Sequence, residues 1–365
     1  MSRRSVVFHR SQLLARENVS AMSGGLNFAT GTGYPLSMTM VPTPPLVFPP
    51  LCPVGGESVA VAEWAPMTAT TVINVYNFGF PVPPAPPGCL TLLSSFSVSA
   101  LPGMTGARIE HIASTSGGLV GGIVVDASGN SYVFTVNFAV NPPVLGTGPT
   151  LLHAVGSGFW NESITYDPAN AVWWIAASSD GTTLPWHTAG RAWTWTPGSA
   201  PNVLPNGLGL RGGVSLAPDP NTPFPLVGSC PSGNCRRGVV LLEQTTTGIQ
   251  AHRIGWDITA GTPTLDWSSM MIPVNAPAPQ QGFVQGPINV DTDGNILCGV
   301  VDTTFVPMPC MGMPWGPGLV EIDRCGTFRR LSSPWTAVPV AFCAQFLAKG
   351  DGGVNWHTQK GYSLP

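Results

Sequence analysis

Carboxylate side chains outside the expected turns are the residues of this chain best suited to chemistry. Paired carboxylates serve as general acid and as nucleophile or base in glycoside hydrolysis. Three glutamates next to aromatic or polar neighbours are candidate catalytic residues: Glu63, Glu110 and Glu162. They predict a glycan-acting hydrolase if at least two of them converge at the ends of strands. The sequence does not bring any two together, and a surface or capping acid is the alternative for each.

Two Trp-His pairs offer binding chemistry. Trp186 and His187 are adjacent, as are Trp356 and His357. An aromatic face stacks on the apolar face of a sugar while a polar ring forms hydrogen bonds, so these pairs are candidate ligand-binding residues. The alternative is that the tryptophans pack in the core, because their large apolar surface dominates core burial.

Metal and cofactor chemistry has little support in the sequence. The six histidines show no metal-ligand spacing, no Cys-x-x-Cys pair occurs, and no complete nucleotide-binding or metalloprotease motif is found. Asp291-Thr-Asp-Gly-Asn resembles the start of a calcium loop, but its glycine is in the fourth place and an apolar strand follows, so a turn is the better interpretation. The sequence therefore predicts neither a metal nor a cofactor.

Eight cysteines leave two alternatives open. Cys230 and Cys235 bracket the turn Pro-Ser-Gly-Asn, and Cys310 and Cys325 flank a Gly/Pro-rich excursion, which makes these four the disulfide candidates. The alternative is that most of the eight are buried free thiols. The lack of a secretory signal favours free thiols.

The composition predicts many short strands joined by many turns. Charged residues are only 9% of the 365, hydrophobic residues are 43%, and the chain has 44 Gly, 39 Pro and 12 Trp. No Lys or Arg stands between Arg16 and Arg108, which argues against nucleic-acid binding because phosphates need clustered basic groups. No apolar run reaches the ~18 residues of a membrane-spanning helix.

Asp-led turns between apolar runs recur along the chain. Segments around Asp126, Asp167, Asp219 and Asp291 read as strand, turn and strand, and the first three lie at spacings typical of propeller blades. Hairpins are expected at 238–254 and 318–331, and the stretch near 264–267 is expected to be a degenerate unit. In this strand order, residues 57–365 resemble β-propellers. The resemblance implies an all-β fold of about five to seven four-stranded blades, with a β-sandwich or jelly roll as the alternative.

The chain divides into three expected regions: a basic polar tail at 1–22, an extended Gly/Pro-rich arm at 23–56 and the propeller at 57–365. The tail lacks a secretory signal but has the style of a mitochondrial transit peptide. We expect a virion or cytoplasmic location, with a mitochondrial one as the alternative.

The leading functional hypothesis is a non-catalytic binding or structural propeller that is part of a larger assembly, such as a virion or a surface structure. Protein partners or further copies of the chain would attach through residues 1–56. The alternatives are the glycan-acting hydrolase described above and a lectin-like carbohydrate-binding module.

Overall fold

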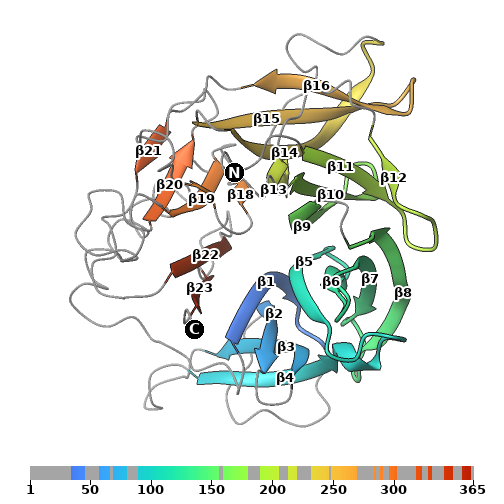
Figure 1. The fold of residues 1–365 in the computed structure, drawn as a ribbon, viewed down its shortest axis with the longest axis vertical. Helices are drawn as coiled ribbons and strands as arrows, with labels where there is room; N and C mark the ends of the chain where they lie inside the picture. Colours follow the sequence, from blue (N-terminus) through green and yellow to red (C-terminus); the bar gives the residue numbers. More distant parts are fainter. Residues whose placement is uncertain are drawn as a thin grey trace.

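The structure of the chain is a computed structural model. Antiparallel β-strands make up nearly all of its described residues that have regular secondary structure (Figure 1). It describes residues 34–45, 57–65, 69–79, 89–155, 159–179, 190–204, 213–219, 232–245, 248–268, 283–284, 288–290, 296–301, 318–322, 328–330, 341–347 and 356–362. Within these ranges the only helical element is one 3-10 turn, η1 (Val98–Ala100). None of the described helices is long and apolar enough to span a membrane.

Four sheets contain four strands each, with neighbours in chain order and antiparallel. Blade 1 consists of β1 (Tyr34–Pro42), β2 (Glu57–Ala65), β3 (Thr70–Gly79) and β4 (Cys89–Ser97). Blade 2 consists of β5 (Arg108–Ser114), β6 (Leu119–Val125), β7 (Ser131–Asn137) and β8 (Val144–His153). Blade 3 consists of β9 (Phe159–Asp167), β10 (Val172–Ser179), β11 (Gly190–Trp195) and β12 (Asn202–Val203). Blade 4 consists of β13 (Gly213–Pro218), β14 (Cys235–Thr245), β15 (Gly248–Asp257) and β16 (Thr262–Ser268).

Two further sheets follow in the chain. Blade 5 contains β17 (Phe283–Val284), β18 (Asn289–Val290), β19 (Ile296–Val301), β20 (Gly318–Ile322) and β21 (Phe328–Arg330), with β17 and β18 both paired to β19. Blade 6 contains the described pair β22 (Ala341–Leu347) and β23 (Trp356–Tyr362).

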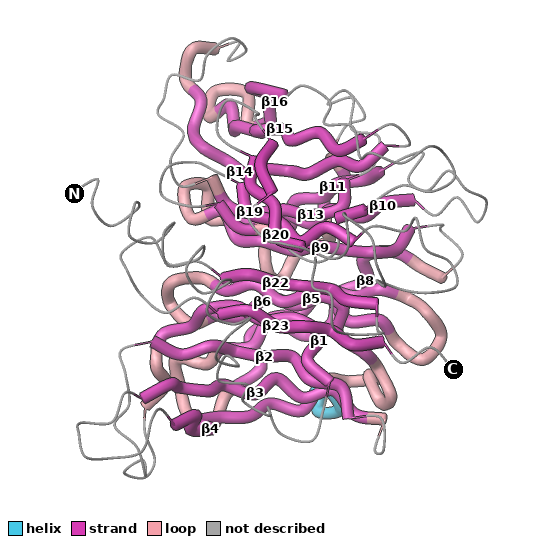
Figure 2. Tube along the Cα trace, turned by 90° about the vertical axis from the view of Figure 1, so that its left-hand side faces the viewer, coloured by secondary structure: helices cyan, strands magenta, loops and turns pink. Residues whose placement is uncertain are grey.

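The six blades form a closed ring. The first strands of blades 1 to 4 contact one another in sequence, and the last blade, through β22 and β23, contacts β1 (Figures 1 and 2). This arrangement is that of a β-propeller, which confirms the predicted fold class and excludes the sandwich alternative.

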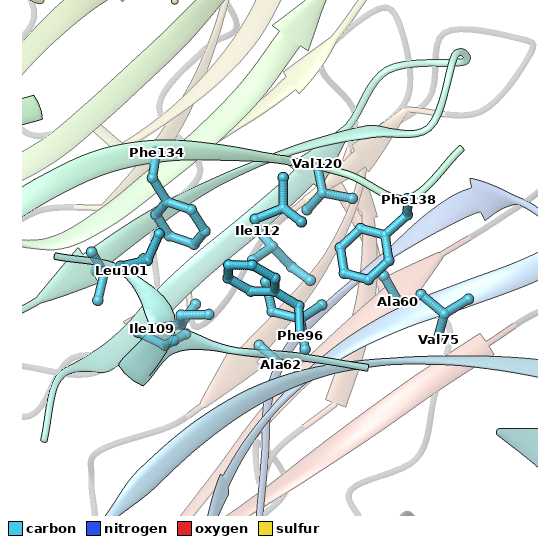
Figure 3. Packing of buried hydrophobic residues seen from close by; sticks show 14 of the residues in the cluster. Ala60, Ala62, Val75, Phe96, Leu101, Ile109, Ile112, Val120, Phe134 and Phe138 are labelled. Carbon is cyan, nitrogen blue, oxygen red and sulfur yellow. The ribbon is translucent and has the colours of Figure 1, made fainter. Parts of the chain in front are cut away.

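The hydrophobic core lies between neighbouring blades. One cluster joins blades 1 and 2 and includes Ala60, Val75, Phe96, Ile112 and Phe134, whose side chains face one another in Figure 3. Similar clusters join blades 2 and 3 and blades 3 and 4. Blades 2 and 3 are buried on both faces, because side chains alternate between the two neighbouring blades along a strand. This explains why the strands of blades 2 and 3 consist of nearly continuous apolar runs.

The first sheet begins earlier than the expected boundary at Glu57. Residues Tyr34–Pro42, inside the segment expected to be an extended arm, form β1, and it pairs with β2 from Tyr34↔Trp64 to Pro42↔Glu57. The strand holds its place because Met38 is buried toward blade 6 and Val41 toward blade 2. The sheet therefore needs part of the 23–56 segment as its innermost strand.

The predicted turns at Asp126 and Asp167 form, but at different positions in the blades, and the turn after Asp219 lies outside the described residues. Asp126 lies between the second and third strands of blade 2, whereas Asp167 lies between the first and second strands of blade 3. Asp126 Oδ1 accepts the N–H groups of Ser128 (2.8 Å) and Asn130 (2.9 Å). The pKa of Asp126 is lowered, chiefly because the Asn130 side chain also donates to it. The sequence spacing between Asp126 and Asp167, which predicted the blade repeat, therefore joins turns at different places in their blades.

The predicted hairpins are confirmed as β14–β15 and β20–β21. The stretch expected to be a degenerate unit is not a unit of its own: Thr264 to Trp267 lie in β16, the outermost strand of blade 4. The turn that begins at Asp291 lies outside the described residues.

Candidate functional site

A β-bulge interrupts the innermost strand of each of blades 1 to 4 at the same place. In β1 the partners step from Pro35↔Glu63 to Ser37↔Ala62, which leaves one extra residue, Leu36. Glu110 is the extra residue in β5 and Val214 in β13. In β9 the extra residue falls between Trp160 and Ser163, where Glu162 stands. Bulges redirect side chains and commonly occur at barrel rims and next to active sites, so this end of the ring is the candidate site.

The residue that follows the bulge in blades 1, 2 and 3 joins two blades. Ser37 Oγ accepts the backbone N–H of Ile112 (3.0 Å), so β1 is bonded to β5. His111 Nδ1 accepts the N–H of Ile164 (3.0 Å), and Ser163 Oγ accepts the N–H of Leu216 (3.1 Å). Three successive seams therefore carry the same side-chain-to-backbone bond, and these bonds hold the bulges in line around the axis.

His111 accepts a backbone N–H at a position where blades 1 and 3 use a serine hydroxyl. We expect His111→Leu to cost about 1–3 kcal/mol, because it leaves the buried N–H of Ile164 without its acceptor. His111→Ser restores an acceptor of the kind that Ser37 and Ser163 provide, so part of that loss should be recovered. Urea denaturation of the three proteins measures the difference. Equal losses for both variants would show that the hydrogen bond is not what His111 contributes.

Glu63 does not lie on an innermost strand. It lies on β2 and is 3% exposed. The Tyr76 hydroxyl donates to its Oε1 (2.8 Å) and the Asn74 amide to its Oε2 (3.2 Å). Burial, followed by the carboxylate of Glu63, raises the pKa of the Tyr76 hydroxyl well above its usual range. Glu63 is a buried structural carboxylate within blade 1, because its neighbours Val59 and Val61 on the same face are core residues.

Glu110 does lie on an innermost strand and is partly exposed. Arg108 Nε donates to Glu110 Oε1 (2.9 Å), and the two side chains are 54% and 25% exposed. This ion pair is the charged group that the described structure presents at the bulged end of blade 2. Glu162 occupies the corresponding bulge of the next blade, and its side chain lies outside the described residues.

The remaining candidates lie mostly outside the described structure. Trp186 and His187 stand between β10 and β11 in the sequence and lie outside the described residues. Trp356 and His357 belong to β23, but their side chains are not described. Cys235 is disulfide-bonded. The pairing of Cys230 with Cys235 stays a prediction, as does that of Cys310 with Cys325.

Two buried acids in blade 4 were not expected to form specific pairs. Glu243, 3% exposed, is 3.0 Å from His252 Nε2 through its Oε2. It stands opposite Gly213 in the sheet, as Glu63 stands opposite Pro35. Asp219 forms an ion pair with Arg253, with Oδ2 and Nη1 2.6 Å apart. The alternation Val239, Leu241, Glu243 was the available signal that Glu243 points into the core.

Among the described residues no group of three or more His, Cys, Asp or Glu side chains is placed to hold a metal ion. The carboxylates whose side chains are described are engaged in turns, in the buried pairs of blades 1 and 4, or in the exposed pair Arg108–Glu110. The chemistry shown at the bulged end is therefore hydrogen bonding by a cation and a carboxylate.

Comparisons with known proteins identify no family. No family model and no curated protein matches the chain. Among solved structures, a protein from Lactobacillus plantarum superposes with a TM-score of 0.44 at 10% identity, over 85% of this chain and 73% of that one. The fucose-specific lectin from Aleuria aurantia gives 0.43 at 11% identity, over 91% and 96% of the two chains. The GH43_1 enzyme from Xanthomonas citri, complexed with xylose, gives 0.39 at 11%, over 90% and 97%. Similarities this low carry no argument about activity.

Proposed function

We propose that this propeller binds an uncharged, hydroxyl-rich ligand, a glycan, at the bulged end of its ring. The observation that carries the proposal is the exposed Arg108–Glu110 pair on the bulge of β5. Guanidinium and carboxylate groups offer several donors and acceptors to sugar hydroxyls. Trp186, His187, Trp356 and His357 remain the proposed partners for stacking and further hydrogen bonds.

Binding without catalysis is favoured because most of the acids with described side chains form structural hydrogen bonds or ion pairs. Glu63, Glu243 and Asp219 are buried and paired, and Asp126, Asp167 and Asp257 close turns. Acids committed to structural bonds are poor candidates for proton transfer to a substrate. The low charge of the chain also suits a neutral ligand better than a charged one.

Glycan hydrolysis is the second candidate, on a specific observation. Glu110 and Glu162 occupy corresponding bulges of neighbouring blades, whose innermost strands are in contact. Glycosidases need two carboxyl groups about 5–10 Å apart. This pair is therefore our candidate for the two carboxyl groups.

Attachment to a larger assembly through residues 1–56 stays a weaker proposal. A truncation at Glu57 would remove β1, the innermost strand of blade 1 and its contacts with blades 2 and 6. Loss of assembly in such a truncated chain would therefore report damage to the propeller as well as loss of an arm. A virion role has no support in the fold or the comparisons.

A glycan array with the full-length chain tests the proposal. We expect binding to a defined class of glycan, weakened at least about 10-fold by Arg108→Ala and by Glu110→Gln, since hydrogen bonds to charged groups contribute about 1.5–3 kcal/mol. Asn202→Ala removes an exposed polar side chain from β12, the outermost strand of blade 3, and should leave binding intact. No bound glycan, or equal binding by all variants, would refute the proposal.

The same glycans distinguish binding from hydrolysis. Incubation with the wild-type chain, followed by analysis of reducing ends, should show no cleavage if the protein only binds. Cleavage that is lost in both Glu110→Gln and Glu162→Gln would instead establish the second candidate. Cleavage that survives either substitution would exclude this pair as the catalytic carboxylates.

A further inference from the structure

Exposed apolar side chains gather on the outer strands of two neighbouring blades. Eight large apolar residues are exposed among the described ones, and six of them lie in blades 1 and 2. We name these six the apolar belt: Leu92, Val140, Val144, Leu145, Leu151 and Val155. Their exposed fractions range from 39% to 61%. Single exposed apolar residues need no explanation, but a gathering of this kind marks an interaction surface.

The belt is held in place by hydrogen bonds on both sides. Asn141 Nδ2 donates to the carbonyl of Leu93 on β4 (3.3 Å) and to that of Pro45 (3.1 Å), so the segment before β8 is bonded to blade 1. The N–H of Val155 donates to Asn130 Oδ1 (2.9 Å), which fixes the segment after β8. The apolar side chains are therefore presented by an ordered edge on either side of β8.

Charge is nearly absent from this part of the chain. Residues 64–161 contain three of the 33 charged residues of the sequence (15 Lys and Arg plus 18 Asp and Glu): Arg108, Glu110 and Asp126. None of the three is on β4, on β8 or in the segments that flank β8. Outer strands usually carry charges, prolines or a short length that prevents association. In blade 3 the outer strand β12 has two residues, and in blade 4 β16 carries Asp266 and Pro263. In blade 2 the outer strand β8 has ten residues and no charge, and Pro149 is the one such device on it.

We propose that the apolar belt is the interface between two copies of this chain, related by a two-fold axis, with β8 facing β8 of the second copy. In an isologous interface each surface meets itself, so any charge would face the same charge, and the belt has none. Nucleic acid and anionic membranes are poor occupants because the belt offers no Lys or Arg.

The contact is made by side chains rather than by a continuous strand ladder. Pro149 in the middle of β8 has no N–H to donate, and the pairing of β8 with β7 is irregular at three places. Both Val144 and Leu145 are exposed, although neighbours on a strand point to opposite faces. The edge of the blade thus offers apolar side chains on both of its faces, and a second copy can pack against both.

Sedimentation equilibrium of the full chain tests this interface, up to about 100 µM so that micromolar affinity is detected. We expect a dimer for the wild type. Val144→Lys/Leu151→Lys places like charges across the two-fold axis and should weaken the dimer at least about 100-fold. Leu92→Lys, outside β8, should weaken it by a smaller factor. Ile258→Lys is the matched control, an exposed apolar residue (37%) of blade 4, and should leave the dimer unchanged.

A monomeric wild type at every concentration would overturn the interface, as would a double variant that associates like the wild type. The circular dichroism and thermal midpoint of each variant show that it is folded. Glycan binding by the double variant should equal that of the wild type, because the belt is on the outer strands and the proposed glycan site on the innermost ones. Failure of the interface and failure of the glycan site are therefore distinguishable.

Discussion

Gly121→Val should be among the most destabilising single substitutions in the chain. Gly121 lies on β6, and the indole ring of Trp173 on β10 packs directly against its backbone, across the seam between blades 2 and 3. A Cβ at position 121 would stand 2.6 Å from Cζ3 of Trp173, closer than real Cβ contacts occur. Trp173 is 1% exposed and packs within the apolar cluster between blades 2 and 3.

We expect a loss of about 3 kcal/mol for Gly121→Val, at the upper end for overpacking because backbone and a buried ring both resist. Trp173→Leu on its own should also be destabilising, because it leaves a cavity between the blades. The double variant should lose less than the sum of the two, since the smaller side chain makes room for the valine. Urea denaturation of the four proteins gives the coupling free energy.

Gly117→Ala supplies the control. Gly117 lies in the turn before β6. Among the described residues, the Thr115 hydroxyl oxygen, at 3.7 Å, is the only neighbour within 4 Å of an added Cβ, and this is an ordinary contact. This substitution should be neutral or slightly stabilising, because it restricts the unfolded chain. Additive losses in the double variant would contradict the packing that we assign to Gly121 and Trp173.

The propeller could be predicted from the sequence because its signals are local. The hairpin between β14 and β15 and the turn at Asp167 are each encoded within about a dozen residues, by alternation and by side chains that bond the backbone. The local sequence does not determine which two strands of a blade a turn connects. Asp126 and Asp167 close similar turns between different pairs of strands, since any two antiparallel strands accept the same turn chemistry.

The first blade shows a different limit. A long Gly/Pro-rich segment separates β1 from β2, so no short-range pattern links the two strands. Their pairing depends on closure of the ring, where β1 contacts blades 2 and 6. Contacts of this kind are made only by the complete fold.

The candidate site could be predicted only in part. Glu110 was predicted because it adjoins a histidine on an expected strand, and it does lie on an innermost strand. The apolar alternation Val59, Val61, Glu63 could have indicated that Glu63 shares a core face. The bulges could not be foreseen, because one extra residue is recognised only from the register with the neighbouring strand.

Loss of the Asp219 carboxylate should be as costly as the overpacking at Gly121. Asp219 and Arg253 are 5% and 7% exposed, and their ion pair is 2.6 Å long. Asp219→Ala leaves the guanidinium of Arg253 buried without this carboxylate, for which we expect a loss of about 3–5 kcal/mol. The exposed pair Arg108–Glu110 gives the comparison: Arg108→Ala should cost no more than about 1 kcal/mol of stability.

The double variant Asp219→Leu/Arg253→Met separates the worth of the pair from the cost of breaking it. It replaces both charges with apolar groups, so its stability should be close to that of the wild type. A double variant as unstable as Asp219→Ala would show that the ion pair does more than neutralise two charges. The geometry suggests what that would be. Asp219 follows β13 and Arg253 lies on β15, so the pair joins the first and third strands of blade 4 across β14, a link that no hairpin in the blade supplies.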